Sequence, residues 1–284
     1  WSVTGVQTCA LPIFNFLKEL KSHVKKALDD DEVKKDCTSK LLRNTNTTGE
    51  IIFKTSSIIY GIEWVDEVFK QVDPRLKLKW HSKNGKYVKK GVKVCTITGK
   101  CQSILSGERV ALNFLQTLSG IANSIDQYKN KIKNTGIKLL YTRKILPGWK
   151  YAIQKLCKSM KCHAHRDDLS SSILIKENHL KLIDNLEEVL LKAKKKNKFV
   201  VIEVSNIREF KLVADNKNVD RILLDNFSIP HIKKILQITK KPIEISGNIN
   251  LSNISKYALK GVNCISVGSL TKNVNCSDIS LLIK

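Results

Sequence analysis

The stretch GIKLLYTRK, residues 136–144, decides how the rest of the sequence is interpreted. Its apolar centre at Leu139 and Leu140 predicts a short buried strand, and Arg143 and Lys144 follow where that strand ends. Ligands of α/β proteins bind at the carboxyl ends of parallel strands. Two cations at such an edge therefore predict a site for an anion.

Five more short apolar stretches follow, at intervals of about 20 to 35 residues, with helical segments between them. The six predicted strands cover residues 137–141, 172–175, 199–204, 221–224, 242–245 and 264–267. Intervals of this length are typical of strand–helix units, whose connections require parallel strands. A closed barrel needs eight strands, so the pattern predicts an α/β fold with an open, incomplete parallel barrel.

Polar residues or glycines stand at the carboxyl end of all six predicted strands. After Arg143 and Lys144 they are Lys176, Glu203, Asp225 with Asn226, Ser246-Gly247-Asn248 and Gly268-Ser269. If the barrel curls, these residues converge on one mouth. The plainer alternative is that they are ordinary loop starts.

The residue types in this set indicate two kinds of ligand. Positive charge for carboxylates or phosphates comes from Arg143, Lys144, His165, Arg166 and Lys176. Glu203 and Asp225 suit a divalent metal, ribose hydroxyls or both. The small-residue turns after the last two strands can hold a phosphate through backbone N–H groups. The expected substrates are an acid with more than one carboxylate and a sugar phosphate held with a metal.

The N-terminal part follows a different pattern. Residues 16–28 have helical spacing, residues 49–62 alternate like a strand, and Asn84-Gly85 and Lys90-Gly91 punctuate short β segments as in hairpins. This mixture predicts an α/β sandwich.

Residues 106–130 then predict one long helix with Ser106 as its N-cap. We divide the chain into a sandwich domain, residues 15–112, and a barrel domain, residues 113–284.

The chain carries 50 Lys and Arg against 26 Asp and Glu, a formal net charge of +24. Such an excess fits a nucleic-acid partner. The lysines are scattered, however, and only residues 192–198 form a dense run. A nucleic-acid-binding module would interleave clustered cations with exposed aromatics, which make up only 6% of the chain. A basic nucleic-acid-binding protein is therefore the alternative, and a pocket for small anions is the main hypothesis.

No apolar run approaches the roughly 20 residues that span a bilayer, so we expect no membrane association and a cytoplasmic location. Residues 1–14 lack an initiator Met and a signal-peptide pattern, and we interpret them as a non-native leader. The eight cysteines lack a framework spacing and are expected to be reduced thiols. The group Cys157, Cys162, His163 and His165 does not have the spacing of zinc modules.

The segments that carry these residues resemble the quinolinate phosphoribosyltransferase family. The matching segments are GERVALNFLQ (107–116), LSGIA (118–122), TRK (142–144), PG (147–148), HR (165–166), LIKENH (174–179), IEV (202–204), LDN (224–226), EISGNI (244–249) and ISVGSLT (265–271). They occur in family order over residues 15–284, and the set is specific although no single segment is.

The resemblance implies an N-terminal α/β sandwich followed by the open barrel of type II phosphoribosyltransferases. It implies that quinolinate and phosphoribosyl pyrophosphate give nicotinate mononucleotide, pyrophosphate and carbon dioxide in NAD biosynthesis, with Mg2+. It also implies a homodimer or homohexamer in which Arg109 reaches the neighbouring subunit's site, and no nucleic-acid or membrane partner.

The resemblance assigns roles to individual residues. Arg109, Arg143, Lys144, His165, Arg166 and Lys176 would surround quinolinate. Glu203 and Asp225 would serve Mg2+, pyrophosphate and ribose, and together with Lys144 and Lys176 they form the expected catalytic set. The remaining expected substrate contacts, mainly to the 5′-phosphate, are Thr142, Ser246, Gly247, Asn248, Val267, Gly268, Ser269 and Lys272.

The chain departs from the family pattern at several positions. Met160, Lys161 and Cys162 replace a glycine-rich run, Asn248 replaces a glycine, Ser171 and Val201 replace acidic residues, Ile145 replaces a threonine and Lys272 replaces a histidine. Glycine permits backbone geometry that other residues resist. A relative with altered activity on another pyridine carboxylate, such as nicotinate, is therefore a further alternative.

Overall fold

The computed structural model describes residues 13–284, which form two compact units. The first unit contains the chain up to Ser119 together with Cys276–Lys284, and the second contains Gly120–Asn275. The division expected at residue 113 lies a few residues earlier than this one, and the last strand, expected in the barrel domain, belongs to the first unit. Of the expected leader, residues 1–12 lie outside the described residues, and α1 begins at Ile13.

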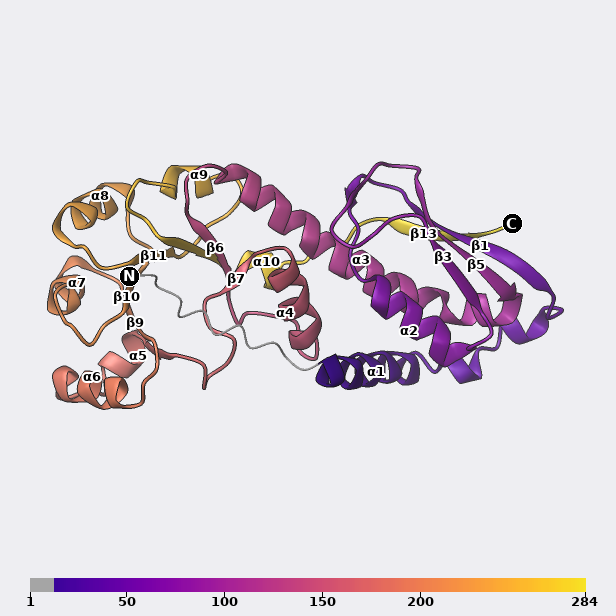
Figure 1. Ribbon diagram of the computed structural model, residues 1–284, viewed down its shortest axis with the longest axis horizontal. Coiled ribbons are helices and arrows are strands. Elements are labelled where there is room, and N and C mark those ends of the chain that lie inside the picture. The colour runs from indigo at the N-terminus through magenta and orange to yellow at the C-terminus, as the bar shows by residue number, and fades with distance from the viewer. Residues whose placement is uncertain (1–12) are drawn as a thin grey trace. The chain divides into compact units, whose positions relative to one another are not determined.

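The first unit is built on an antiparallel four-stranded sheet of order β13-β1-β5-β3 (Figure 1). Its strands are β1 (Asn46–Phe53), β3 (Lys77–Trp80), β5 (Lys93–Lys100) and β13 (Ile279–Ile283). A separate pair joins β2 (Ser57–Ile58) to β4 (Tyr87–Val88). Its helices are α1 (Ile13–Asp30), α2 (Ile62–Val72) and the first part of α3 (Cys101–Lys131), with 3-10 turns at Val33–Lys35 and Ser39–Leu41.

The apolar face of α2 contributes large side chains to the core of the first unit. Trp64 and Phe69 are fully buried, because helical spacing places the large apolar residues of α2 on one side. The Trp64 indole N–H donates to His23 Nδ1 at 3.3 Å. Burial and the nearby Lys26 lower the pKa of His23, which keeps that nitrogen available as an acceptor.

Two expectations for the first unit were wrong in detail. The long helix begins at Cys101, so Ser106 lies inside it and is not its N-cap. Hydrogen bonds from Ser39, and a further one from the Ser106 hydroxyl at 2.7 Å, lower the pKa of Asp36 to about 2. The expected turns near Gly85 and Gly91 are present, but β3 pairs with β5 and not with β4.

The second unit is a seven-stranded parallel sheet of order β7-β6-β12-β11-β10-β9-β8. Its strands are β6 (Lys138–Tyr141), β7 (His163–Ala164), β8 (Ile173–Ile175), β9 (Val200–Val204), β10 (Arg221–Asp225), β11 (Ile243–Ser246) and β12 (Cys264–Val267). Its helices, besides the end of α3, are α4 (Lys150–Ser159), α5 (Glu177–Leu180), α6 (Leu186–Lys195), α7 (Ile207–Val213), α8 (Ile229–Ile238), α9 (Ile254–Tyr257) and α10 (Ser269–Lys272).

This strand order is that of a barrel left open on one side. Strands that follow one another in the chain lie side by side, with the exception of β7 and β8. β12 returns to pair with β6, and β7 and β8 form the two open edges. The open α/β barrel and all six predicted strands are therefore confirmed. The seventh strand, β7, was not predicted, because two residues carry no periodicity. Figure 1 shows α6, α7 and α8 outside the strands, which explains why β9 and β11 are almost continuously buried.

The barrel interior below the strand ends is partly apolar. Leu174, Val201 and Leu223 form a buried cluster contributed by β8, β9 and β10. Val201 is the residue that replaces an acidic one in the family pattern. Its packing against two leucines gives this replacement a physical basis, since an unpaired carboxylate would be costly there.

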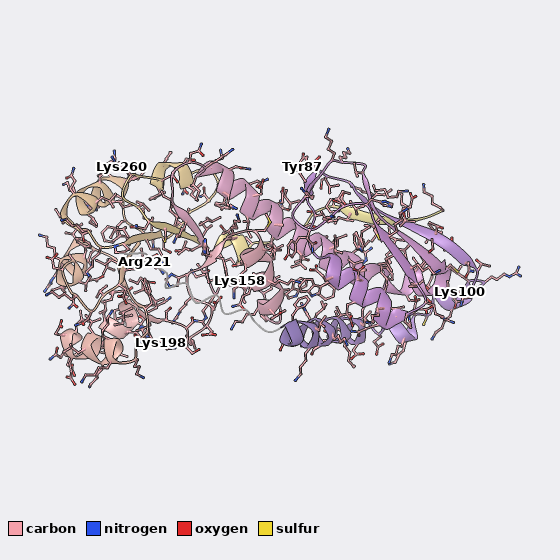
Figure 2. All side chains as sticks on the ribbon, viewed as in Figure 1. Tyr87, Lys100, Lys158, Lys198, Arg221 and Lys260 are labelled. Atoms are coloured by element: carbon pink, nitrogen blue, oxygen red, sulfur yellow. The ribbon has the colours of Figure 1, made fainter. Side chains whose placement is uncertain are left out.

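The structure also bears on the hydropathy and the charge of the chain. Within residues 13–284, no helix combines the length and apolar character needed to cross a membrane. Lysines are distributed over many elements: Lys100 ends β5, Lys158 lies in α4, Lys198 follows α6 and Lys260 precedes β12 (Figure 2).

Candidate active site

A cavity of about 340 Å³ opens at the carboxyl ends of the parallel strands. Nine residues that the sequence singled out line it: Thr142, Arg143, Lys144, His165, Arg166, Lys176, Glu203, Asp225 and Ser246. The other lining residues are Leu174, Leu223 and Ser266. The strands run in the same direction, so their carboxyl ends share one edge and residues far apart in sequence meet there.

The cationic side chains of the cavity influence one another. Burial and the neighbouring Arg143 guanidinium lower the pKa of Arg166. Lys176 Nζ lies 3.8 Å from Glu203 Oε2, and 44% of the Lys176 side chain remains exposed. The ammonium group is therefore accessible to a ligand. Such a cluster repels itself and favours an anion with more than one negative charge.

The two acidic residues of the cavity come from the adjacent strands β9 and β10. Burial raises the pKa of Glu203; Lys176 partly offsets this effect and Asp225 adds to it. A bound cation would relieve the repulsion between the two carboxylates. Among residues 13–284, no three His, Cys, Asp or Glu side chains are grouped to hold a metal. A pair of carboxylates nevertheless fits Mg2+, which is often held by one or two carboxylates with water and substrate phosphates.

The turn after β11 keeps the backbone form that glycine allows. Gly247 and Asn248 have φ of 96° and 49°, in the left-handed region that asparagine tolerates better than most residues. Asn248 Nδ2 donates to Asn226 Oδ1 at 3.0 Å, and Asn226 Nδ2 donates to Asp225 Oδ2 at 2.8 Å. Asparagine at position 248 thus preserves the turn and links it to Asp225.

Gly247→Ala is expected to lower the free energy of unfolding by about 2–4 kcal/mol. A Cβ atom on Gly247 would lie 2.3 Å from Asn226 Oδ1 and 2.6 Å from the Asn226 backbone nitrogen, so the strand end would have to move. Gly136→Ala is the matched control: its φ is +74° but a Cβ there meets nothing within 4 Å, so it should cost only about 1 kcal/mol. Chemical denaturation measures both, and equal losses would show that the turn accepts a side chain.

The loop that carries Arg143 and Lys144 is fixed to the start of α10. The Thr271 hydroxyl donates to the Lys144 carbonyl oxygen at 2.7 Å, and the Lys144 N–H donates to Thr142 Oγ1 at 3.2 Å. Gly268 packs against the side chain of Lys144, since a Cβ atom at position 268 would lie 3.3 Å from Lys144 Cδ. These contacts hold the Lys144 backbone beside the last small-residue turn.

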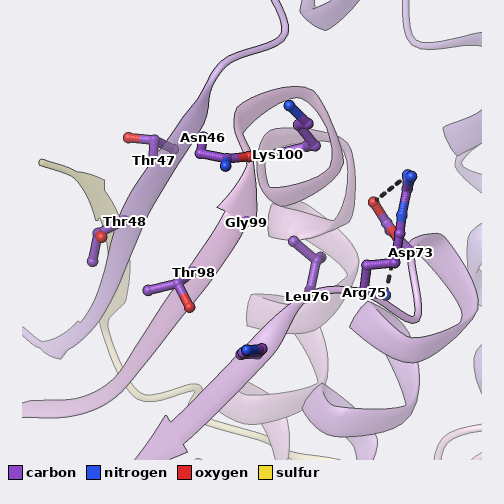
Figure 3. Close-up of a pocket in the computed structure, with 10 residues that line it drawn as sticks. Asn46, Thr47, Thr48, Asp73, Arg75, Leu76, Thr98, Gly99 and Lys100 are labelled. Carbon is purple, nitrogen blue, oxygen red and sulfur yellow. Dashed lines mark hydrogen bonds and ion pairs between the residues drawn. The ribbon is translucent and has the colours of Figure 1, made fainter.

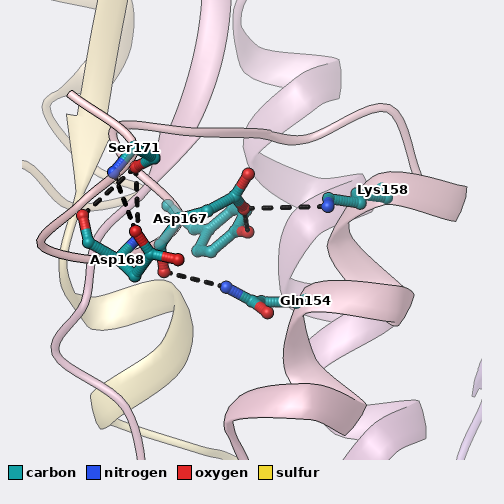
Figure 4. A network of polar contacts seen from close by, with 6 residues as sticks. Gln154, Lys158, Asp167, Asp168 and Ser171 are labelled. Atoms are coloured by element: carbon teal, nitrogen blue, oxygen red, sulfur yellow. Dashed lines mark hydrogen bonds and ion pairs between the residues drawn. The ribbon is translucent and has the colours of Figure 1, made fainter. Parts of the chain in front are cut away.

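The connection between β7 and β8, which carries Arg166, is held by a polar network (Figure 4). Asp167 Oδ1 accepts a hydrogen bond from the Tyr141 hydroxyl at 3.2 Å and lies 3.8 Å from Lys158 Nζ. Gln154 Nε2 donates to the Asp167 carbonyl oxygen at 3.0 Å. The network anchors the segment next to Arg166 on α4 and β6.

Two other departures from the family pattern are accommodated locally. Ser171 takes part in a turn in which its backbone N–H donates to Asp168 Oδ1 at 2.8 Å. Lys161 has a φ of 53° at the end of α4, where glycine would be unstrained. The following Cys162 N–H donates to the Cys157 carbonyl oxygen at 2.8 Å, and a hydrogen bond between the Cys157 and Cys162 side chains together with burial raises the pKa of the Cys157 thiol. The cysteines among the described residues are free thiols.

Sequence reasoning missed a buried charged group beneath the cavity. His165 Nδ1 lies 2.7 Å from Glu244 Oε1, and Arg221 Nε lies 3.0 Å from Glu244 Oε2. Glu244 is fully buried. The signal that could have found it is a single charge inside the apolar strand of residues 242–245. Ser266 was also missed, because nothing local distinguishes an inward-facing serine.

The remaining predicted residues lie outside this lining. Gly247, Asn248, Gly268 and Ser269 belong to the turns that follow β11 and β12, Val267 is buried at the end of β12, Lys272 is exposed at the end of α10 and Arg109 is exposed on α3 in the first unit.

Another cavity, of about 530 Å³, lies in the first unit near β1, β3 and β5 (Figure 3). Its Arg75 forms an ion pair with Asp73 at 2.8 Å, and hydrogen bonds from Arg75 hold the pKa of Asp73 below its usual range. This arginine is already neutralised, and none of the predicted site residues lines the cavity. The barrel cavity is therefore the better candidate for an active site.

Comparison with known proteins agrees with this geometry. The profile of the quinolinate phosphoribosyl transferase N-terminal domain matches residues 36–119, and that of the C-terminal domain matches residues 121–282. A Bacillus subtilis protein named probable nicotinate-nucleotide pyrophosphorylase (carboxylating) is 32% identical, with 82% of each chain covered. The chloroplastic Arabidopsis thaliana protein of that name is 30% identical, covering 93% of this chain and 83% of the relative.

The fold agrees as well. The solved structure of the nicotinate-nucleotide pyrophosphorylase from Francisella tularensis superposes with a TM-score of 0.89 at 33% identity, covering 94% of this chain and 96% of that one. The two domain profiles, the curated relatives and the solved structure thus agree, and the chain belongs to the quinolinate phosphoribosyl transferase family.

Proposed function

We propose that this protein transfers the phosphoribosyl group of phosphoribosyl pyrophosphate to quinolinate, producing nicotinate mononucleotide, pyrophosphate and carbon dioxide. The names of its relatives support this reaction. The observation that carries the proposal is the shared lining of the barrel cavity, in which five basic side chains and two carboxylates come together.

The basic side chains would bind quinolinate and stabilise the charge that develops on it. Arg143 and Arg166 are suited to its two carboxylates, since a guanidinium can bind a carboxylate through two hydrogen bonds. Loss of carbon dioxide leaves electron density on the pyridine ring. A fixed ammonium group such as that of Lys176 or Lys144 would stabilise this charge, an effect worth about 3–4 kcal/mol for one well-placed donor.

The two carboxylates would act on the ribose side of the reaction. Departure of pyrophosphate builds positive charge on the ribose ring, which Glu203 and Asp225 can offset. Both residues would also hold Mg2+ together with the substrate phosphates, and the metal would supply a better leaving group by neutralising the pyrophosphate. The backbone N–H groups of the turns beginning at Ser246 and Gly268 would bind the 5′-phosphate, with Lys272 beside the second turn.

Purified protein should release carbon dioxide from carboxyl-labelled quinolinate only when phosphoribosyl pyrophosphate and Mg2+ are present. Nicotinate carries one carboxylate and should not form a nucleotide at a comparable rate. Trapped label and mononucleotide, quantified together, distinguish the two substrates. Efficient nucleotide formation from nicotinate, without decarboxylation of quinolinate, would favour the alternative of altered specificity.

The oligomeric assembly and the location of the protein are proposals as well. We propose a homodimer or larger assembly in which the exposed Arg109 of one copy reaches the site of another, and a cytoplasmic location. A nucleic-acid role would instead require salt-dependent binding that survives loss of Arg143 and Lys176.

A further inference from the structure

The barrel interior holds a buried carboxylate, that of Glu244, which the proposed reaction does not use. Glu244, in the middle of β11, is 0% exposed, and its carboxylate lies between His165 and Arg221. A buried carboxylate is costly unless it is paired and hydrogen-bonded. The buried Glu244 carboxylate therefore indicates a specific role.

Arg221 balances the charge of Glu244 without help from the histidine. Its Nε atom lies 3.0 Å from Glu244 Oε2, although without hydrogen-bond geometry. Its guanidinium also donates to Cys264 Sγ at 3.6 Å and lies 5.2 Å from the centre of the Phe199 ring. Since Arg221 is always cationic, His165 is not needed as a counterion.

The contact between Glu244 and His165 fixes where the imidazole proton resides. His165 Nδ1 lies 2.7 Å from Glu244 Oε1. An ionised carboxylate can only accept hydrogen bonds, so Nδ1 must carry the proton. In a neutral imidazole the other nitrogen, Nε2, is then unprotonated.

The other face of the same ring belongs to the cavity. His165 is a lining residue, its side chain is only 8% exposed, and its Nε2 atom has no hydrogen-bond partner among the described residues. A buried polar atom without a partner, next to a polar cavity, is placed to meet a ligand.

We propose that Glu244 is a positioning residue, whose buried carboxylate holds His165 in the Nδ1–H tautomer and presents Nε2 to the substrate. Arg221 is the counterion that holds the carboxylate in place. The part of this inference that concerns the substrate rests on the proposed function, with quinolinate as the ligand that meets Nε2. The tautomer itself is a property of the unliganded protein.

The tautomer is tested by long-range 1H–15N correlation spectra of the protein in alkaline buffer, with His165→Ala identifying the signal among the six histidines. Wild-type His165 should show the Nδ1–H pattern. In Glu244→Gln, Arg221 should keep the amide oxygen and leave the amide N–H group facing Nδ1, so the ring should change to the Nε2–H pattern. An Nε2–H pattern in the wild type, or an unchanged pattern in the variant, would overturn the proposal. The wild-type spectrum decides even if Glu244→Gln does not fold.

A double-mutant cycle separates positioning from a general effect on the fold. By calorimetry, Glu244→Gln should weaken quinolinate binding by about tenfold, yet by less than about twofold in the His165→Ala background. The affinity for phosphoribosyl pyrophosphate should stay within about twofold in all variants. Equal losses in both backgrounds would mean that Glu244 does not act through His165. If the wild type binds no quinolinate at all, the proposed function fails, while the spectra still decide the tautomer.

Discussion

Lys176→Ala is expected to lower kcat/KM for quinolinate by about 10²–10³-fold, the usual cost of removing one preorganised electrostatic donor from an active site. Lys176 follows β8 at the mouth of the barrel, where its ammonium lies 3.8 Å from Glu203 and 44% of the side chain is exposed. Truncating a partly exposed side chain creates no buried void. The thermal unfolding midpoint should therefore change little.

Lys181→Ala is the matched control for this variant. Lys181 follows α5, one turn beyond Lys176, and pairs with Glu177 on the surface with 64% of its side chain exposed. An exposed pair of this kind contributes little to stability, and Lys181 does not line the cavity. Steady-state kinetics with both substrates should show parental rates for Lys181→Ala. If Lys176→Ala retains rates within tenfold of the parent, its assigned role is wrong.

Glu203→Gln is expected to lower activity by about 10²-fold and to weaken the dependence of the rate on Mg2+, because one of the two carboxylates that would hold the metal becomes neutral. Asp225→Asn should act in the same direction. Rates measured over a range of Mg2+ concentrations at saturating quinolinate test this. A dependence identical to that of the parent would refute the metal assignment.

The same Glu203 substitution should stabilise the unliganded protein at neutral pH. Burial raises the pKa of Glu203 above its ordinary value of 4.5. The folded state therefore binds this proton more tightly than the unfolded state. Its favourable contribution is complete below about pH 4.5 and is lost as pH rises through the folded pKa. At neutral pH the folded protein contains a disfavoured charge, which glutamine removes.

Thermal unfolding at several pH values measures this effect. The melting temperature of Glu203→Gln should exceed that of the parent at neutral pH, and the difference should disappear in acid, where the parent residue is protonated. Glu188→Gln, which removes one member of the exposed pair with Lys192 on α6, should show no such gain. A variant less stable than the parent at neutral pH would mean that the ion pair with Lys176 outweighs burial.

The recurring strands and their polar carboxyl ends could be predicted because both are local properties of the chain. The run around Leu139 and Leu140 is apolar because β6 is covered on both faces, and Arg143 follows because the strand ends there. The Ser106 cap was mispredicted for a related reason. Its side chain pairs with Asp36, a partner distant in the sequence, and the helix extends back to Cys101 through the buried Ile104.

The domain limits could not be predicted exactly, because they depend on contacts between residues far apart in the chain. α3 runs through the division between the two units, so no change of composition marks it. Strand β13 has an ordinary apolar pattern, and only its antiparallel pairing with β1 assigns it to the first unit. The two-residue β7 exists because β6 offers it hydrogen bonds.

The sequence by itself therefore predicted an open parallel barrel and the residue types of one site for an anionic substrate, which follow from periodicity and from the order of strand ends. Its motifs resembled the family to which the chain belongs. Only the tertiary structure decided that nine of those residues line one cavity, that Asn248 reproduces a glycine turn, and that Glu244 joins His165 to Arg221 inside the barrel. These features depend on contacts between residues far apart in the chain, and such contacts leave no periodic signal in the sequence.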